Sequence, residues 1–148
     1  MYITRYTDYS LRVLMFLAVK GEDELSTIQE IADSYDISKN HLMKVVQELN
    51  NKQYLVAVRG KNGGLRLNGR PEDINIGVLV RDIEKDLILV ECFNDETACV
   101  ITRACHLKKL FSKALDAFLE VLDNHTLADL VPSAKRQTAL AQLLHIAT

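Results

Sequence analysis

The chain has 148 residues, of which 48% are hydrophobic and 26% are charged, and its formal net charge is −2. This composition indicates one globular domain, or one domain with an extension. The apolar run at residues 13–19 is too short to cross a membrane and no signal peptide precedes it, so we expect a cytoplasmic protein with no membrane contact.

Three helices are expected at the start of the chain. The first covers residues 9–20 and is apolar on most sides, which is typical of a core helix. The second starts after Thr27, with Glu30 placed to complete a capping box. The third covers residues 38–50, with a serine as its cap. Only the turn at residues 35–37 separates the last two, as in a helix-turn-helix.

A basic hairpin is expected to follow these helices. Residues 54–58 are strand-like, residues 59–64 form a glycine-rich turn, and residues 65–67 return as a second strand. Three helices and such a hairpin make a winged helix, whose third helix enters the major groove of DNA. The glycines precede a strand rather than a helix, so a nucleotide-binding phosphate loop has little support.

The charge of this region agrees with a surface that faces a polyanion. Between residues 36 and 70, seven basic residues stand against two acidic ones, although an ordinary solvated face explains the charge equally well. We predict that the third helix reads base edges and that the wing contacts phosphate or the minor groove. The predicted DNA-binding residues are Ser38, Lys39, Asn40, His41 and Lys44 on the helix, and Arg59, Lys61, Asn62 and Arg66 on the wing.

The second half of the chain predicts two further helices around a loop, and then a last one. A fourth helix is expected from residue 73 or 75 to about 84, a loop at 87–104, a long helix at 105–124 and a last helix at 134–146. The long helix carries an apolar stripe that either packs on its own domain or forms a dimer, which we favour because helix-turn-helix proteins usually bind two half-sites. The stripe consists of Leu107, Leu110, Phe111, Ala114, Leu115, Phe118, Leu119 and Leu122.

The expected fold is therefore mainly α, a winged helix-turn-helix domain with a two-stranded wing followed by a long dimerisation helix. Residues 1–72 form the DNA-binding region, 73–104 a linker helix and cysteine loop, 105–125 the dimerisation helix, and 126–148 a C-terminal helical segment.

All three cysteines of the chain, Cys92, Cys99 and Cys105, fall within fourteen residues of a polar loop. Where thiols stay reduced, such a cluster indicates a soft-metal centre more than a disulfide or three inert thiols. Structural zinc sites use a cysteine pair two to four residues apart. The gaps here are six and five residues, which favours an iron–sulfur cluster whose thiolates bind different irons. Zinc with His106 as a further ligand, and a peroxide-sensing thiol, remain alternatives.

Several motifs resemble one known family. They are the segments at residues 7–12, 42–46, 60–64 and 126–130, together with the cysteine triad. In these the chain is similar to the winged-helix iron–sulfur transcriptional repressors of the NsrR and IscR type, over nearly its whole length. The resemblance implies a homodimer that binds operator DNA and is not an enzyme. It also implies a 2Fe–2S or 4Fe–4S cluster whose nitrosylation by nitric oxide releases the operator. A sensor of iron–sulfur-cluster or redox status, of the IscR type, is the alternative.

The resemblance also implies a fourth cluster ligand. In NsrR-like proteins it is an aspartate near the N-terminus of the partner subunit, and Asp8 matches that motif position. In IscR-like proteins it is a histidine, and the matching position here is Lys108, which is a poor ligand. His106 is a second candidate. Without the resemblance, Asp8 would be interpreted as an acid stabilised by the helix dipole.

Overall fold

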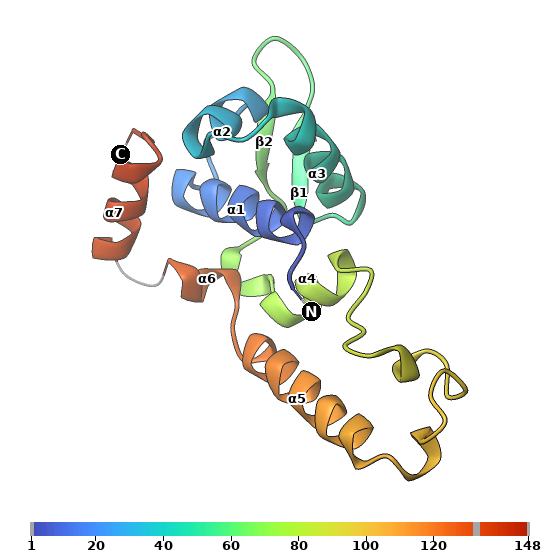
Figure 1. The fold of residues 1–148 in the computed structure, drawn as a ribbon. Helices are drawn as coiled ribbons and strands as arrows, with labels where there is room; N and C mark the ends of the chain where they lie inside the picture. The colour runs from blue at the N-terminus through green and yellow to red at the C-terminus, as the bar shows by residue number, and fades with distance from the viewer. Residues whose placement is uncertain (1, 132–133, 148) are drawn as a thin grey trace.

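The structure is a computed structural model that describes residues 2–131 and 134–147. It confirms the mainly α fold with a two-stranded wing (Figure 1). The helices and strands are α1 (Arg5–Lys20), α2 (Ile28–Tyr35), α3 (Lys39–Asn51), β1 (Leu55–Val58), β2 (Gly64–Leu67), α4 (Ile76–Ile83), α5 (His106–Asp123), α6 (Leu127–Leu130) and α7 (Ala134–Leu143).

We call α1 to α4 with the β hairpin the body, and its core forms where α1, α2 and α3 meet. Leu14 of α1, Ile31 of α2 and Leu42 of α3 are completely buried there. Each such side chain contributes about 1.5–3 kcal/mol by leaving water. The predicted capping box is present, because Thr27 N–H donates to Glu30 at 2.7 Å and Glu30 N–H donates back at 3.1 Å.

The start of α1 differs from the prediction, because the helix begins at Arg5 rather than residue 9. Thr4 is the N-cap, and its hydroxyl accepts from the N–H of Thr7 at 3.4 Å. The sequence hides this turn because its inward-facing Thr7 is polar, yet Thr7 is completely buried. Ser38 lies at the N-cap of α3 as predicted, but its side chain makes no capping hydrogen bond.

The wing is a single antiparallel pair in which Leu55 faces Leu67 and Val58 faces Gly64. The two leucines of the first pair are buried against the body, whereas Arg66, which faces Val56 in the next pair, is exposed. Gly60 has a φ of 112°, a conformation that favours glycine at the turn. The alternation of side chains thus holds the hairpin on the core and leaves its basic residues in solvent.

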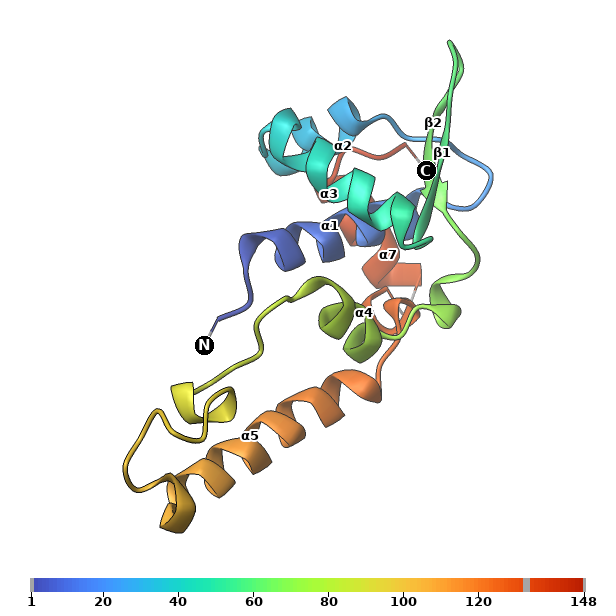
Figure 2. The ribbon, with the colours of Figure 1, turned by 90° about the vertical axis from the view of Figure 1, so that its right-hand side faces the viewer.

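The second half of the chain projects from the body as an arm, which we define as residues 85–126 (Figures 1 and 2). The described structure buries no residue of this arm. The first part of the arm is the predicted loop, which contains two short 3-10 turns, Glu91–Phe93 and Thr102–Ala104. The helix α5 then starts directly after Cys105.

The far end of α5 is fixed to α4. Arg81 forms a two-pronged ion pair with Asp123, one contact being 2.8 Å from Nη2 to Oδ2. Asn75 Nδ2 donates to the carbonyl of Asp123 at 2.7 Å. Gly77 allows the close approach, because a Cβ there would lie 2.9 Å from the backbone nitrogen of Asp123. These contacts set the direction in which α5 leaves the body.

The C-terminal segment returns to the body. The short helix α6 was not predicted, and α7 ends at Leu143, earlier than the expected residue 146. Leu144 and Ile146 are buried, and Ser34 donates to the carbonyl of Leu144 at 2.9 Å, so this end packs beside α1 and α2. Positions 132, 133 and 148 of the predicted segment lie outside the described residues. In the described ranges no helix is both long and apolar enough to cross a bilayer.

Candidate cysteine site and nucleic-acid interface

The nine residues predicted to contact DNA are all exposed. Lys39, at the start of α3, lines a hollow of about 320 Å³ together with Val58, Gly60 and Gly63 of the wing. The N-terminal end of α3 and the wing therefore border one surface, as expected for a winged helix that follows a DNA groove.

The basic side chains of this surface are uncompensated. Five of the nine residues are cations, and none of them takes part in an ion pair within the described part of the chain. They are Lys39, Lys44, Arg59, Lys61 and Arg66. Exposed cations of this kind can contact phosphate.

The structure adds residues of α3 that the sequence interpretation missed. Met43 is 49% exposed, which is unusual for a methionine inside a folded domain. It borders a groove with Asn40, Lys44, Gln47 and Asn50, and this groove reaches the base of the wing. The sequence contains the pattern that predicts this surface. The buried positions of α3 repeat with helical spacing, so positions 40, 43, 44 and 47 lie on the opposite, exposed side of the helix.

The N-terminal turns of α1 contact α3 directly. Tyr6 Oη donates to the carbonyl of Lys44 at 2.9 Å. Burial, with a smaller effect of Glu48, raises the pKa of Tyr6 to about 12, so this hydroxyl stays protonated and able to donate. The rings of Tyr9 and His41 lie with their centroids 6.4 Å apart. The first turns of α1 are therefore in direct contact with α3.

All three cysteines line one cavity of about 430 Å³ in the arm. Cys92 lies in the first 3-10 turn, Cys99 in the loop, and Cys105 at the N-cap of α5. All three are free thiols, two of them half-buried and Cys99 exposed. The loop thus brings together the three side chains that the sequence predicted as ligands.

The lining of this cavity suits an iron–sulfur cluster. Apolar residues, among them Leu89, Ile101 and Phe111, also line this cavity, in which Ile101 and Cys99 are exposed. Within the described residues, no three His, Cys, Asp or Glu side chains converge closely enough to hold one metal ion.

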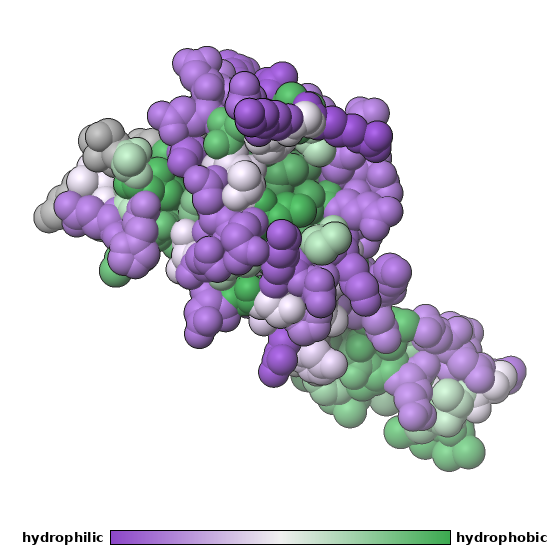
Figure 3. Space-filling model, turned by 90° about the horizontal axis from the view of Figure 1, so that it is seen from above, coloured by the Kyte–Doolittle hydropathy of each residue, from purple (hydrophilic) through white to green (hydrophobic). Residues whose placement is uncertain are grey.

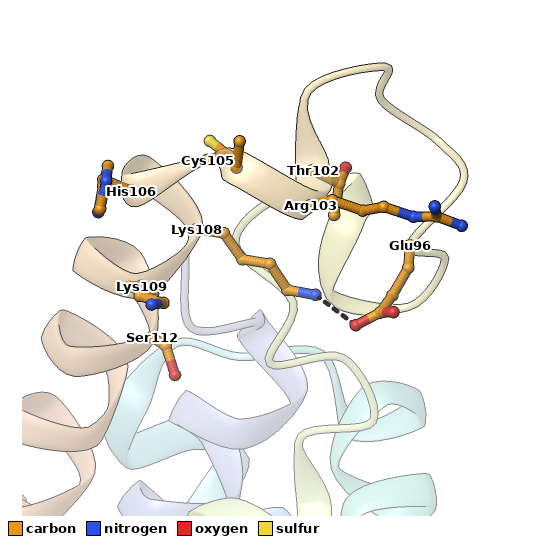
Figure 4. Close-up of a pocket in the computed structure, with 9 residues that line it drawn as sticks. Glu96, Thr102, Arg103, Cys105, His106, Lys108, Lys109 and Ser112 are labelled. Atoms are coloured by element: carbon orange, nitrogen blue, oxygen red, sulfur yellow. Dashed lines mark hydrogen bonds and ion pairs between the residues drawn. The ribbon is translucent and has the colours of Figure 1, made fainter.

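Two contacts hold the loop around these cysteines. Lys108 Nζ pairs with Glu96 Oε1 at 3.1 Å (Figure 4), so Lys108 has a structural partner rather than a ligand role. Asp95 accepts from the hydroxyl and N–H of Thr97, and these hydrogen bonds lower the pKa of Asp95. Cys105 directly precedes α5 as its N-cap residue, and its side chain makes no capping hydrogen bond.

The two candidates for a fourth ligand lie elsewhere. His106 lines a separate cavity of about 640 Å³ with Lys109 and Ser112, which also includes Cys105 but neither of the other cysteines (Figure 4). Asp8 lies in the first turns of α1 and does not line the cysteine cavity of its own chain. Its carboxylate forms an ion pair with Arg12, with 2.8 Å between Oδ2 and Nη2, and both side chains are about half-exposed.

Comparisons with known proteins agree with these features. The family model Rrf2, described as an iron-dependent transcriptional regulator, matches residues 3–133. The HTH-type transcriptional regulator NsrR of Bacillus licheniformis is 55% identical over 132 residues, which cover 88% of this chain and 92% of that protein. The protein of the same name from Bacillus subtilis is 54% identical over 132 residues, covering 88% and 90%.

Among solved structures, CymR of B. subtilis, described as the global cysteine regulator, matches with a TM-score of 0.72. It is 28% identical, and the match covers 88% of this chain and 95% of that one. The similarity to known winged-helix regulators thus extends over nearly the whole chain, arm included.

Proposed function

The chain belongs to the Rrf2 family of iron-dependent transcriptional regulators, and on this premise we propose that it is a homodimeric repressor that senses nitric oxide through an iron–sulfur cluster. One observation carries the proposal. Three free thiols line one cavity at the end of an arm that is attached to a winged-helix body. A regulator with this arrangement can report the state of a metal centre to DNA.

The DNA-binding part of the proposal rests on the exposed residues of α3 and the wing. Asn40, His41 and Lys44 project from the helix that would enter the major groove, where amides and cations pair with base edges. Arg59, Lys61 and Arg66 would contact phosphates, which fix the register and make affinity depend on salt. Operator DNA and reduced thiols are both found in the cytoplasm, where we expect the protein to act.

The homodimer rests on the apolar stripe of α5. Leu107 and Leu110 of this stripe, and Val121 beside it, are more than half exposed, and no residue of α5 is buried in the single chain. Figure 3 shows this hydrophobic surface gathered on the projecting arm. Contiguous apolar surface of this kind marks an interface. A second copy covers it by symmetry and places two α3 helices for two half-sites.

Cys92, Cys99 and Cys105 would hold the cluster. We propose Asp8 of the partner subunit as the fourth ligand, because Asp8 matches the motif position that supplies this ligand in NsrR-like proteins. Its carboxylate is partly exposed and lies outside the cysteine cavity of its own chain. When bound, the cluster supplies iron with which nitric oxide reacts.

The four ligands then tie the arm of one subunit to α1 of the other. While they are joined, the two α3 helices keep a spacing that must match half-sites about 34–36 Å apart. A carboxylate is a weaker ligand for iron than a thiolate, so Asp8 would be the weakest of the four attachments. With that attachment lost, α1 and α3 would be free to leave that spacing and to release the operator.

The test uses protein in which the cluster has been reconstituted under anaerobic conditions. Operator binding is followed by gel shift while nitric oxide is added, and the cluster is followed by its absorption. We expect binding to fall together with the cluster signal. Operator binding that is unchanged after the cluster is lost would contradict the proposal. A response to oxygen or iron supply but not to nitric oxide would favour a sensor of the IscR type.

A further inference from the structure

Glu84 is a buried carboxyl side chain with an unusual set of partners. It is only 6% exposed, although glutamate is rarely buried unless it is paired. No ion pair reaches it within the described residues. Its Oε2 instead accepts three hydrogen bonds, from Thr4 N–H at 3.1 Å, from the Thr4 hydroxyl at 3.0 Å and from the Thr7 hydroxyl at 2.6 Å.

These donors belong to the N-terminus of α1. Thr4 is the N-cap of that helix, and Thr7 is a completely buried residue of its first turn. The positive end of the helix dipole favours an acceptor at this place. Glu84 is therefore hydrogen-bonded to the N-cap residue and the first turn of α1.

Glu84 also lies at the point where the arm leaves the body. It is the C-cap of α4, and it is the last buried residue before residues 85–126, none of which is buried. Displacement of the near end of the arm is thus resisted first by the bonds from Glu84 to α1.

The same turns of α1 contact the helix proposed to read DNA. Thr4 and Thr7 face Glu84, whereas Tyr6 and Tyr9 face α3, through the hydrogen bond to the carbonyl of Lys44 and the ring contact with His41. Asp8 lies between Thr7 and Tyr9 in the same turns. One short segment therefore connects the root of the arm to α3.

We propose that Glu84 is a positioning residue that transmits the state of the arm to α3 through the first turns of α1. Glu84 does not hold the cluster in this proposal. It makes the position of α1, and hence of α3, depend on where the arm is held. The inference rests on the proposed function, because it needs an arm whose position changes with the cluster.

The experiment measures coupling rather than stability. Operator Kd is determined by fluorescence anisotropy for cluster-loaded and for nitric-oxide-treated dimer, and the ratio of the two values is compared among variants. For the wild type we expect a ratio of about 5–150, the usual range of allosteric coupling. Glu84→Ala, which removes all three hydrogen bonds, should bring the ratio near one, and Thr7→Val, which removes the shortest of them, should lower the ratio clearly below the wild-type value.

Two variants serve as controls. Glu84→Gln keeps an oxygen with two lone pairs, enough to accept from the Thr7 hydroxyl and from one donor of Thr4, so it should retain most of the ratio. Ile83→Val trims a neighbouring buried side chain that makes no such bond, so it should lower the melting temperature while the ratio stays. A wild-type ratio in Glu84→Ala and Thr7→Val, or a Gln variant as uncoupled as Ala, would overturn the proposal.

A second readout needs no cluster. In the apo protein, Glu84→Ala should speed amide hydrogen exchange in the first turns of α1 and at residues 41–45 of α3, and leave α2 unchanged. Acceleration throughout the body would indicate simple destabilisation and count against the inference. A wild type whose operator binding ignores nitric oxide would refute the proposed function instead, so the two failures are distinguishable.

Discussion

At the scale of single residues, the Asp8 carboxylate has one partner in the single chain, Arg12, and a second one, the cluster, in the proposed dimer. In the single chain its carboxylate is held by Arg12, one turn further along α1. Arg12 is in turn placed by aromatic rings, with its guanidinium carbon 5.7 Å from the centroid of Tyr9 and 5.8 Å from that of Tyr35. A ligand role in the dimer requires this carboxylate to leave Arg12, which costs little because exposed ion pairs contribute only about 0–1 kcal/mol.

Replacing Asp8 and Arg12 separately tests this role. Both Asp8→Ala and Arg12→Ala break the ion pair, but only the first removes the proposed ligand. We expect Asp8→Ala to shorten the lifetime of the cluster by at least about tenfold, and Arg12→Ala to leave the cluster intact. The decay of cluster absorbance under anaerobic chelator challenge measures this. Equal lifetimes in the two variants would remove Asp8 from the ligand set.

On the DNA-binding surface, Met43 and Lys61 are expected to contribute differently to operator affinity. Met43→Ala should raise the Kd for the operator by about fivefold, roughly 1 kcal/mol, because an apolar side chain in the groove contacts thymine methyl groups. Lys61→Ala should weaken binding to every sequence alike and reduce the slope of log K against log salt by about 0.9. Anisotropy titrations on operator and random DNA at several salt concentrations separate the two. Both side chains are exposed, so neither substitution should change the folding of the protein.

At the scale of elements, the joint between α4 and α5 depends on pH. The guanidinium of Arg81 lowers the pKa of Asp123 below its ordinary value of 3.8. A carboxyl whose pKa is depressed by folding contributes stability above its unfolded pKa and loses it as pH falls through the folded value. The contribution is small, because both side chains are about 40% exposed.

We therefore expect the docking of α5 to be insensitive to pH from neutral down to about 4, and to weaken below it. In Arg81→Gln this acid-dependent part should be absent, because the pKa of Asp123 returns toward its ordinary value. Urea midpoints between pH 7 and 3 measure the difference. Parallel curves for wild type and variant would show that the pair does not fasten the joint.

The elements also show what sequence reasoning can reach. The helices with regular apolar spacing, the capping box at Thr27 and the wing were predicted because their signals are local. The first turn of α1 was missed because its buried face is Thr7, whose partner Glu84 lies 77 positions away. The helix α6 was missed because four residues are too few to show a period.

The candidate site divides in the same way. The three cysteines line one cavity, in keeping with their closeness in sequence, and their role as cluster ligands stays a prediction. The groove beside Met43 could have been predicted by extending the helical pattern of α3 to the residues on its outer side. The ion pair between Lys108 and Glu96 spans a loop without regular structure, so no spacing rule gives it.

At the scale of the whole molecule, the proposal depends on a second copy covering α5. Leu110→Glu places a charge at a position that is 62% exposed in the single chain, so the body should fold normally. We expect the variant to be monomeric, because each buried leucine contributes about 1.5–3 kcal/mol and occurs twice in a symmetric interface. Sedimentation velocity measures the mass, and operator affinity should fall with it.

Lys113→Glu is the matched control, since it introduces the same side chain on the outer side of α5. It should remain dimeric. A dimeric Leu110→Glu, or a monomeric Lys113→Glu, would mean that the stripe does not form the interface.

Within the described part of the chain, the helix α5 is fixed to the body at one end only, so a small rotation at that end produces a larger displacement at the other. From the joint at Asp123 to the cysteine end the helix has 18 residues, a length of about 27 Å. A displacement of about 1 Å at the cysteine end then corresponds to a rotation of about 2° at the joint, by the same helical geometry. Holding the tip in place therefore fixes the angle closely with few bonds. Conversely, a small angular error at the body is magnified where the thiols lie, so accuracy at the joint decides whether the ligands of two chains can meet.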